Sequence, residues 1–260
     1  MKKKLNNFQL KEFLDEKYHL YNRKEFIQTD PISIPHQFSK KEDIEIAGFL
    51  SATIAWGQRT TILKNANEIV QKMDFAPHQF ILNFKPAELS IFDQFVHRTF
   101  NAQDLKVFLL SLQRIYRKYG SLEALINHYS TTEQTELSLV ISLWRAEFFK
   151  VEHQPRTLKH FSDPLKGSAS KRISMFLRWM VRKDEYGVDF GLWKSVSSEI
   201  LTCPLDVHSG RVARKLGLLS RTQDDWKAAS ELTKKLKTFD PSDPVKYDFA
   251  LFGLGVFEKF

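Results

Sequence analysis

Two short segments place reactive side chains at the starts of two predicted helices. The first is Leu165-Lys-Gly-Ser-Ala-Ser-Lys-Arg-Ile173, in which a turn of small residues precedes an amphipathic run. Small residues let a backbone approach a partner closely, and the N–H groups at a helix start favour an anion. The segment therefore suits phosphate binding. An ordinary capped helix start, with Ser168 or Ser170 as the N-cap, fits it equally well.

The second segment is Pro204-Leu-Asp-Val-His208, followed by a predicted helix with an Arg-Lys-Leu-Gly end. By itself, Asp206 is most simply a helix cap, which stabilises by about 1 kcal/mol. Next to a lysine amine, Asp206 could also take part in catalysis. A carboxylate stabilises a developing positive charge and accepts a proton, and an amine attacks a sugar carbon to give a Schiff base. Lys171 and Asp206 are therefore the candidate catalytic pair.

Most of the excess positive charge lies in one window. The chain has a net charge of +8, and residues 156–183 contain eight basic residues against one acid. A solvated helix face would account for such a window, but the concentration favours contact with phosphates. We expect Lys166 to Ser170 to bind the phosphate backbone of a nucleic acid. Arg178 and Arg182, on an exposed helix face, are expected to add electrostatic attraction to the phosphates.

Apolar residues recur with helical periodicity along the chain, and alternating strand patterns are absent. The stretch Thr29 to Pro35 cannot continue a helix, because each proline restricts its predecessor. A further helix is expected to end before Pro164. The other helices that this periodicity predicts cover residues 42–55, from about 59, 102–119 with a cap at Gly120, 136–149, 170–182, 207–216, 224–237 and 244–251.

These elements predict an all-α fold of two helical lobes with a helix-hairpin-helix element and a cleft between the lobes. One lobe would be a helical barrel over residues 42–184, including a hairpin at about 163–173. The other would combine residues 1–41 with 185–260. Residues 183–202 would form an inserted loop or helix between the two candidate catalytic segments.

Composition excludes several classes of protein. The single cysteine, Cys203, cannot form an intrachain disulfide or hold a metal ion alone, which fits a reducing compartment. The eight histidines include no His-x-x-x-His pair, so no metal site is predicted. The basic N-terminus lacks an apolar core, and the run Ile46 to Trp56 is far shorter than a bilayer span of roughly 20 residues. We expect a cytoplasmic monomer with no cofactor and no membrane partner.

Together the two segments resemble the helix-hairpin-helix (HhH-GPD) superfamily of base-excision DNA glycosylases. The family hairpin reads approximately Leu-Pro-Gly-Val-Gly-x-Lys-x-Ala, and its aspartate segment reads like Val-Asp-Thr-His or Pro-Val-Asp-Val-His. The stretch Ile46-Ala-Gly-Phe-Leu-Ser-Ala52 is similar to the opening of the family's barrel. This chain departs from the pattern at Ala169, where the second hairpin glycine would stand, and at Ile173. As a whole it looks closer still to an uncharacterised bacterial family of unknown function.

The resemblance implies an enzyme that cleaves the N-glycosidic bond of a damaged base in duplex DNA, with possible AP lyase activity. Lys171 falls on the lysine of the bifunctional members and Asp206 on the catalytic acid. The alternative is a non-catalytic nucleic-acid-binding protein that retains the helix-hairpin-helix scaffold. The partner nucleic acid could also be RNA. The residues expected to contact DNA are Lys166, Gly167, Ser168, Ala169, Ser170, Arg172 and Gln58.

A target base inside a duplex must be flipped out and stacked on aromatic or apolar side chains. The candidates for this base pocket are Trp56, Phe190, Trp193 and His208. Each aromatic has a competing interpretation as a core residue, and His208 has one as a support for its loop. Gln58, in the turn after Trp56, would fill the vacated position in the base stack.

Overall fold

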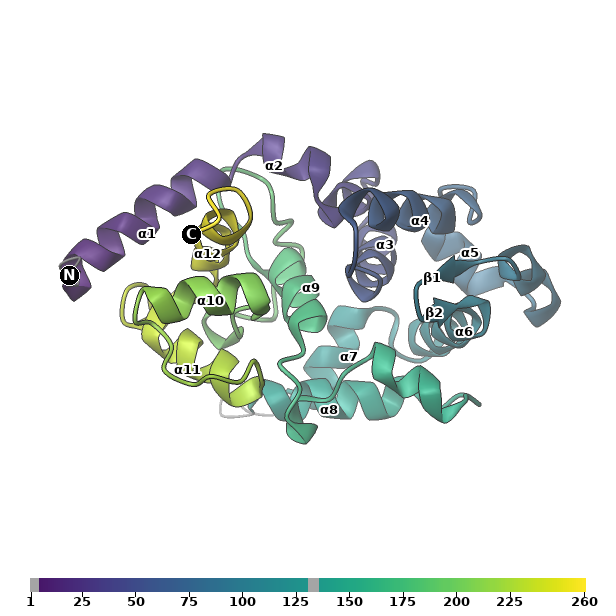
Figure 1. The fold of residues 1–260 in the computed structure, drawn as a ribbon. Helices are drawn as coiled ribbons and strands as arrows, with labels where there is room; N and C mark the ends of the chain where they lie inside the picture. The colour runs from purple at the N-terminus through teal and green to yellow at the C-terminus, as the bar shows by residue number, and fades with distance from the viewer. Residues whose placement is uncertain (1–4, 131–135) are drawn as a thin grey trace. The chain divides into compact units, whose positions relative to one another are not determined.

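The protein is mostly helical in the computed structural model, which describes residues 5–130 and 136–260 (Figure 1). One antiparallel pair, β1 (Val96–His97) and β2 (Phe100–Asn101), is the sheet recorded in these ranges. The predicted all-α class is confirmed. The α-helices are α1 Asn7–Tyr21, α2 Lys24–Thr29, α3 Lys41–Thr53, α4 Arg59–Gln71, α5 Pro77–Asn83, α6 Ala102–Tyr119, α7 Leu122–Tyr129, α8 Leu137–Phe148, α9 Lys171–Val181, α10 Val207–Lys215, α11 Trp226–Lys237 and α12 Tyr247–Val256.

Short 3-10 segments connect these helices, and every one except η6 begins at a proline. Proline fixes φ and lacks an N–H, which suits the first position of a helical turn but prevents continuation from the residues before it. The segments are η1 Pro31–Ser33, η2 Pro35–Gln37, η3 Pro86–Phe92, η4 Pro155–His160, η5 Pro164–Lys166, η6 Ser198–Ile200 and η7 Pro244–Lys246.

The chain divides into two compact units. Unit 1 contains the described residues up to Phe26 together with Pro164–Phe260, and unit 2 contains Ile27–Asp163. This division differs from the predicted one of residues 42–184 against 1–41 plus 185–260. Residues 164–173 of the predicted hairpin group with the C-terminal helices, and the turn of this segment is hydrogen-bonded to the start of α11. The cleft expected between two lobes stays a prediction.

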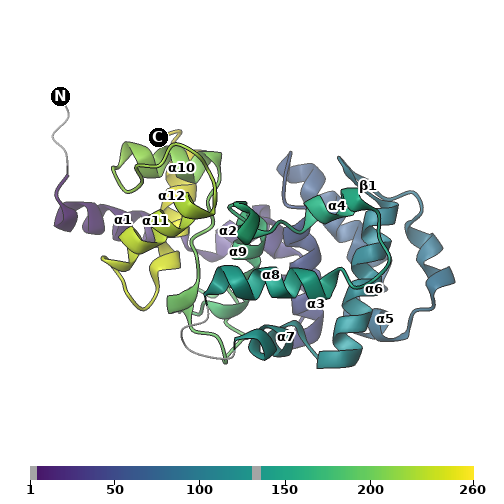
Figure 2. The ribbon, with the colours of Figure 1, turned by 90° about the horizontal axis from the view of Figure 1, so that it is seen from below.

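In unit 1, α12 is the central apolar helix. It packs against α1 and α10, and α10 lies beside it in both views (Figures 1 and 2). Gly253 allows the close approach of α1, since a Cβ at that position would overlap the ring of Tyr21. The fully buried Trp179 and Trp193 add to the core of this unit.

Unit 2 has a core rich in phenylalanine, and α5 runs beside α6 within it (Figure 2). Phe49 of α3 lies with its ring centre 5.4 Å from both Trp144 and Phe148 of α8. Phe108 of α6 packs edge-to-face on Phe148 at 4.8 Å. These rings are fully buried, and each such ring buries about 150–250 Å² on folding.

The helices predicted by periodicity over residues 42–237 begin and end within two residues of their expected bounds. Helix α6 is the clearest case. Asn101 and Asp104 form a capping box at its start, and Gly120 ends it in the left-handed conformation at φ 83°. The last predicted helix, 244–251, is instead η7 followed by α12.

One expectation about local structure is wrong. The segment before Pro164 is not the end of an α-helix, since α8 ends at Phe148 and the 3-10 segment η4 follows. Prolines 155 and 164 explain this, because neither can donate the hydrogen bond that a continuing helix needs. The hairpin therefore has one α-helical arm, α9, preceded by the single turn η5. Residues 183–202 are mostly irregular, with η6 as their helical turn.

Candidate functional site

The turn before α9 is held in an unusual backbone conformation. Gly167 has φ +87° and Ser170 has φ +47°, and a non-glycine residue in this left-handed region is uncommon. Ser170 occupies the N-cap position without a side-chain cap hydrogen bond. The Oγ of Ser168 instead accepts from the Ser170 N–H at 3.1 Å. Ala169 is outside the left-handed region, so its methyl group in place of a glycine costs no backbone strain.

The start of α11 anchors this turn. The N–H of Trp226 donates to the carbonyl of Gly167 at 3.1 Å, and Ser168 forms a β-bridge with Asp225. Asp225 is also the N-cap of α11. Lys166 and Gly167 lie exposed at the outside of the turn. The outer part of the predicted phosphate-contacting turn is therefore accessible, and the turn is fixed to a second helix. Ser168 and Ala169 are half-buried, and Ser170, also an expected DNA contact, is buried at 2% exposure.

Lys171 and Asp206 are brought together, although 35 residues separate them. The Nζ of Lys171, the first residue of α9, lies 2.7 Å from Oδ2 of Asp206, just before α10. The two side chains keep 30% and 20% of their surface exposed. The pair is thus formed within unit 1 and open to solvent.

Asp206 uses its two carboxylate oxygens differently. Oδ1 accepts from the N–H groups of His208 and Ser209 at 2.8 and 2.9 Å, which caps α10. Oδ2 faces the lysine. Burial raises the pKa of Asp206, but Lys171 and the hydrogen bonds from Ser209 outweigh it, so the pKa lies below its usual range. The carboxylate is ionised at neutral pH.

A second carboxylate near this pair, Asp248 on α12, was missed in the sequence. It is buried, receives a hydrogen bond from Arg178, and interacts electrostatically with both Lys171 and Asp206. Burial raises the pKa of Asp248 to about 6, against the lowering effect of Arg178 and Lys171. The sequence signal that could have identified Asp248 is its position as the one acid on the apolar helix Tyr247–Val256. A buried carboxylate requires a partner, so such an acid indicates a charged or hydrogen-bonding site nearby.

The expectation that Arg178 and Arg182 form an exposed basic face is wrong. Their exposed fractions are 3% and 1%. Arg182 forms ion pairs with three carboxylates at 2.7 to 3.0 Å, contributed by Asp184, Asp189 and Asp243. Because these acids follow α9 or lie far along the chain, the charges are neutralised inside unit 1 and are not available to phosphates.

Of the other basic residues in the window 156–183, two lysines are exposed and two arginines are half-buried. Lys159 and Lys183 are exposed. Arg156 of unit 2 is tied to the buried Asp104 at 2.8 Å. Arg172, an expected DNA contact, is half-buried, and burial lowers the pKa of its guanidinium to about 10, so it stays cationic at neutral pH.

Of the candidates for a base pocket in unit 1, Trp193 is a core residue. Its ring is fully buried and packs edge-to-face on Phe176 at 5.6 Å, and its backbone N–H donates to the carbonyl of Met180. Phe190 is half-buried, and its N–H donates to the carbonyl of Trp179. His208 is exposed on the first turn of α10.

Trp56 and Gln58 belong to unit 2. The half-buried ring of Trp56 stacks on His160 at 5.8 Å and meets His97 edge-to-face at 4.8 Å. Gln58 is exposed at the N-cap of α4 without a side-chain cap hydrogen bond. Gly57 between them has φ +104°, and a Cβ there would lie 3.0 Å from the side chain of Arg98. The turn is therefore specific to glycine.

Within residues 5–130 and 136–260, no group of three or more His, Cys, Asp or Glu side chains is arranged to hold a metal ion. In the same ranges, no helix has both the length and the apolar character that crossing a bilayer requires.

Comparison with curated proteins and with solved structures returns no match. Residues 30–257 match a family described as "Protein of unknown function (DUF2400)". This match covers most of unit 1 and all but the first residues of unit 2. The chain therefore belongs to the DUF2400 family.

Proposed function

We propose that this protein is a DNA-binding base-excision glycosylase that cleaves the N-glycosidic bond of a damaged base and has AP lyase activity. The observation that carries the proposal is the contact of 2.7 Å between the Lys171 amine and the Asp206 carboxylate. Both groups are partly exposed, and they lie at the starts of α9 and α10. A cytoplasmic location fits the single, free thiol of Cys203.

The pair suits nucleophilic chemistry at a sugar carbon. The Asp206 carboxylate can stabilise the positive charge that develops at C1′ of the deoxyribose, and its Oδ2 is placed to accept a proton from the lysine amine as the amine attacks that carbon. The bond from C1′ to the base breaks, and the base leaves with its electron pair and takes up a proton. Sugar ring opening gives a Schiff base on Lys171. Loss of a proton from C2′ and of the 3′ phosphate then cleaves the strand.

The turn of residues 166–170 is the proposed contact to the DNA backbone. Lys166 supplies an exposed charge, and Gly167 has open space where a Cβ would stand. A phosphate could therefore approach the backbone of the turn closely. A base in a duplex is out of reach of Lys171, so the enzyme must act on a flipped nucleotide.

Borohydride trapping on duplex DNA with an abasic site tests the lyase step. The wild-type protein is expected to form a covalent adduct that Lys171→Ala abolishes. Lys11→Ala is the matched control, because Lys11 also forms an ion pair in unit 1, at 2.6 Å from Asp15. Asp206→Asn should slow adduct formation by about 10²- to 10⁴-fold, the usual contribution of a general base.

Base release from duplexes containing 8-oxoguanine, uracil or oxidised pyrimidines tests the glycosylase step. If the wild-type protein releases no base and forms no adduct, but Lys166→Ala still weakens DNA binding and its salt dependence, the protein is a binding protein without cleavage. An adduct that survives in Lys171→Ala excludes the proposed role of this lysine.

A further inference from the structure

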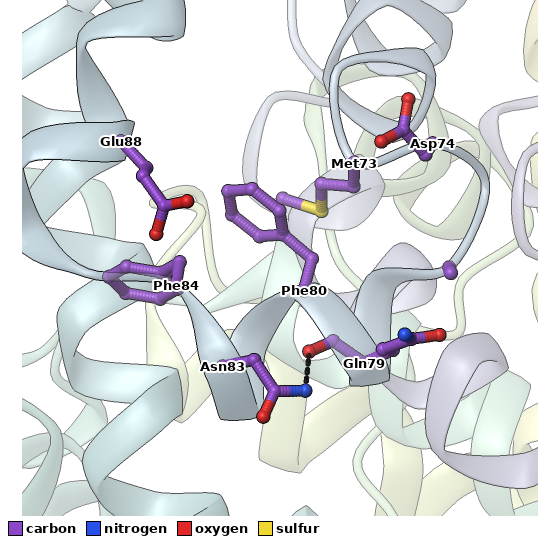
Figure 3. A pocket seen from close by; sticks show the side chains of 8 residues that line it. Met73, Asp74, Gln79, Phe80, Asn83, Phe84 and Glu88 are labelled. Atoms are coloured by element: carbon purple, nitrogen blue, oxygen red, sulfur yellow. Dashed lines mark hydrogen bonds between the residues drawn. The ribbon is translucent and has the colours of Figure 1, made fainter.

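Unit 2 contains a pocket of about 450 Å³ that lies outside the proposed catalytic segments (Figure 3). The turn after α4, helix α5 with the residue that follows it, and the 3-10 segment η3 contribute to it. Its volume is within the range of pockets that hold small molecules. The lining residues are Met73, Asp74, Ala76, Gln79, Phe80, Asn83, Phe84 and Glu88.

The apolar part of the pocket is aromatic. The rings of Phe80 and Phe84 stack with centres 5.3 Å apart, and Phe80 also meets Phe92 edge-to-face at 6.0 Å. Met73 and Phe84 are buried, whereas Phe80 keeps part of its ring accessible. A fixed aromatic face of this kind accepts a flat apolar group or a cation.

The polar part is acidic. Asp74 and Glu88 are exposed and stand on opposite sides of the Phe80 ring in Figure 3. Among the described residues, neither carboxylate forms an ion pair, and the lining includes no Lys, Arg or His. Glu88 accepts a hydrogen bond from the Lys85 N–H through one oxygen, which fixes its position. In a chain of net charge +8, the charged side chains of this lining are both negative.

A strained turn holds one of these acids in place. Asp74 and Phe75 both have φ 52°, in the left-handed region. Aspartate tolerates this conformation, but a bulky residue such as phenylalanine rarely adopts it. The Phe75 N–H donates to the carbonyl of Val70, which closes the turn after α4. Phe75 itself is 50% exposed, so core burial does not account for the strain, and the turn instead fixes Asp74 at the pocket edge.

We propose that this pocket binds a small organic cation that is carried on a flat apolar group. The apolar group would lie against Phe80 and Phe84, and the positive charge would be attracted by Asp74 and Glu88 from the two sides of the Phe80 ring. The proposal is independent of glycosylase activity, because the pocket shares no residue with the Lys171 site.

Benzamidine, benzamide and benzoate are suitable probes, since they have nearly one shape and carry a positive, zero and negative charge. The full chain is labelled with ¹³C in the methionine methyl groups. Met73 lines the pocket, whereas Met175 and Met180 belong to unit 1 and serve as internal controls. Benzamidine should shift the Met73 signal saturably at millimolar concentration and leave the Met175 and Met180 signals in place. Benzamide should bind more weakly, and benzoate should not bind.

Two conservative variants test the carboxylates. Asp74→Asn keeps a residue that tolerates the left-handed backbone, and Glu88→Gln keeps an acceptor for the Lys85 N–H. Each should weaken benzamidine binding about two- to fivefold, as expected for a partly exposed charge pair. Asp93→Asn is the control, because Asp93 is an exposed carboxylate of unit 2 that pairs with Lys106 outside the pocket.

The proposal is overturned if the Met73 signal does not reach saturation by about 50 mM benzamidine, well above a millimolar dissociation constant. Equal binding of all three probes also overturns it, because charge would then play no part. So does unchanged affinity in both pocket variants.

Discussion

Replacing Arg182 by methionine tests whether the end of α9 is a buried charge network or a basic surface. Methionine keeps an unbranched apolar side chain in a site that is 1% exposed, but it leaves three carboxylates without their shared cation. Removing one partner of a buried ion pair costs about 3–5 kcal/mol. We therefore expect unit 1 to lose about that much stability at pH 7, together with the hydrogen bond of 2.7 Å from Arg182 to Tyr18.

The neighbouring Lys183→Met is the matched control. Lys183 is exposed, so the same change there should alter the free energy of unfolding by no more than about 0.5 kcal/mol. Hydrogen exchange of peptides from α9, measured across a urea series, separates unit 1 from unit 2. This matters because a chain of two units need not unfold in one transition.

The effect should also depend on pH. Arg182 holds the pKa of Asp184 below its usual range against the raising effect of burial, whereas burial keeps the pKa of Asp243 raised. Without Arg182, the pKa of each carboxyl rises, so protonation relieves the repulsion as pH falls. The destabilisation should be larger at pH 8 than at pH 5. A loss below about 1 kcal/mol at pH 8, or one equal to that of Lys183→Met, would refute the buried network.

Three further perturbations have defined outcomes. Glu147→Gln should destabilise unit 2 by about 3 kcal/mol at pH 7, because the buried carboxylate pairs with several cations. These cations hold the pKa of Glu147 in the folded protein far below its usual range against the raising effect of burial. Unfolding measured in an acid titration should therefore show the stability difference between wild type and variant disappearing as pH falls from about 5. Asp206→Ala should destabilise unit 1 by about 1–2 kcal/mol in urea unfolding, and Asp206→Asn by about 1 kcal/mol less, because asparagine keeps the cap on α10. Gly120→Ala should cost about 1 kcal/mol through its positive φ alone, whereas Gly57→Ala should cost more in the same assay because its methyl group also displaces Arg98.

Local signals predicted the elements well. Helix α6 could be bounded because its periodicity, its Asn101 cap and its Gly120 stop all lie within the segment itself. The same reasoning failed before Pro164, where two prolines limit the backbone to 3-10 turns. A 3-10 turn and the last turn of an α-helix have similar sequence patterns, so the hairpin seemed to have two α-helical arms.

Long-range charge pairing could not be predicted in this way. Arg178 and Arg182 are opposite the apolar stripe of α9, which usually indicates a solvent-exposed face. That face meets Asp189, in the irregular segment after α9, and Asp248, on α12. Neither residue belongs to the helical period of α9, so the pattern of α9 could not reveal these partners. The contact between Lys171 and Asp206 could be anticipated only from resemblance to a family. The pocket at Phe80 was missed because its lining comes from a turn and two separate helical segments.

The geometry of Asp206 bears directly on the proposed reaction. One oxygen is fixed by two N–H groups of α10, so the carboxylate does not depend on the lysine for its orientation. If Lys171 moves toward a sugar carbon, Asp206 stays in position to stabilise the positive charge that develops there. A surface ion pair that served stability alone would gain little from this arrangement, since such pairs contribute about 0–1 kcal/mol. Separating the cap from the contact with the amine gives a carboxylate that is positioned before substrate arrives, and electrostatic catalysis requires that kind of preorganisation.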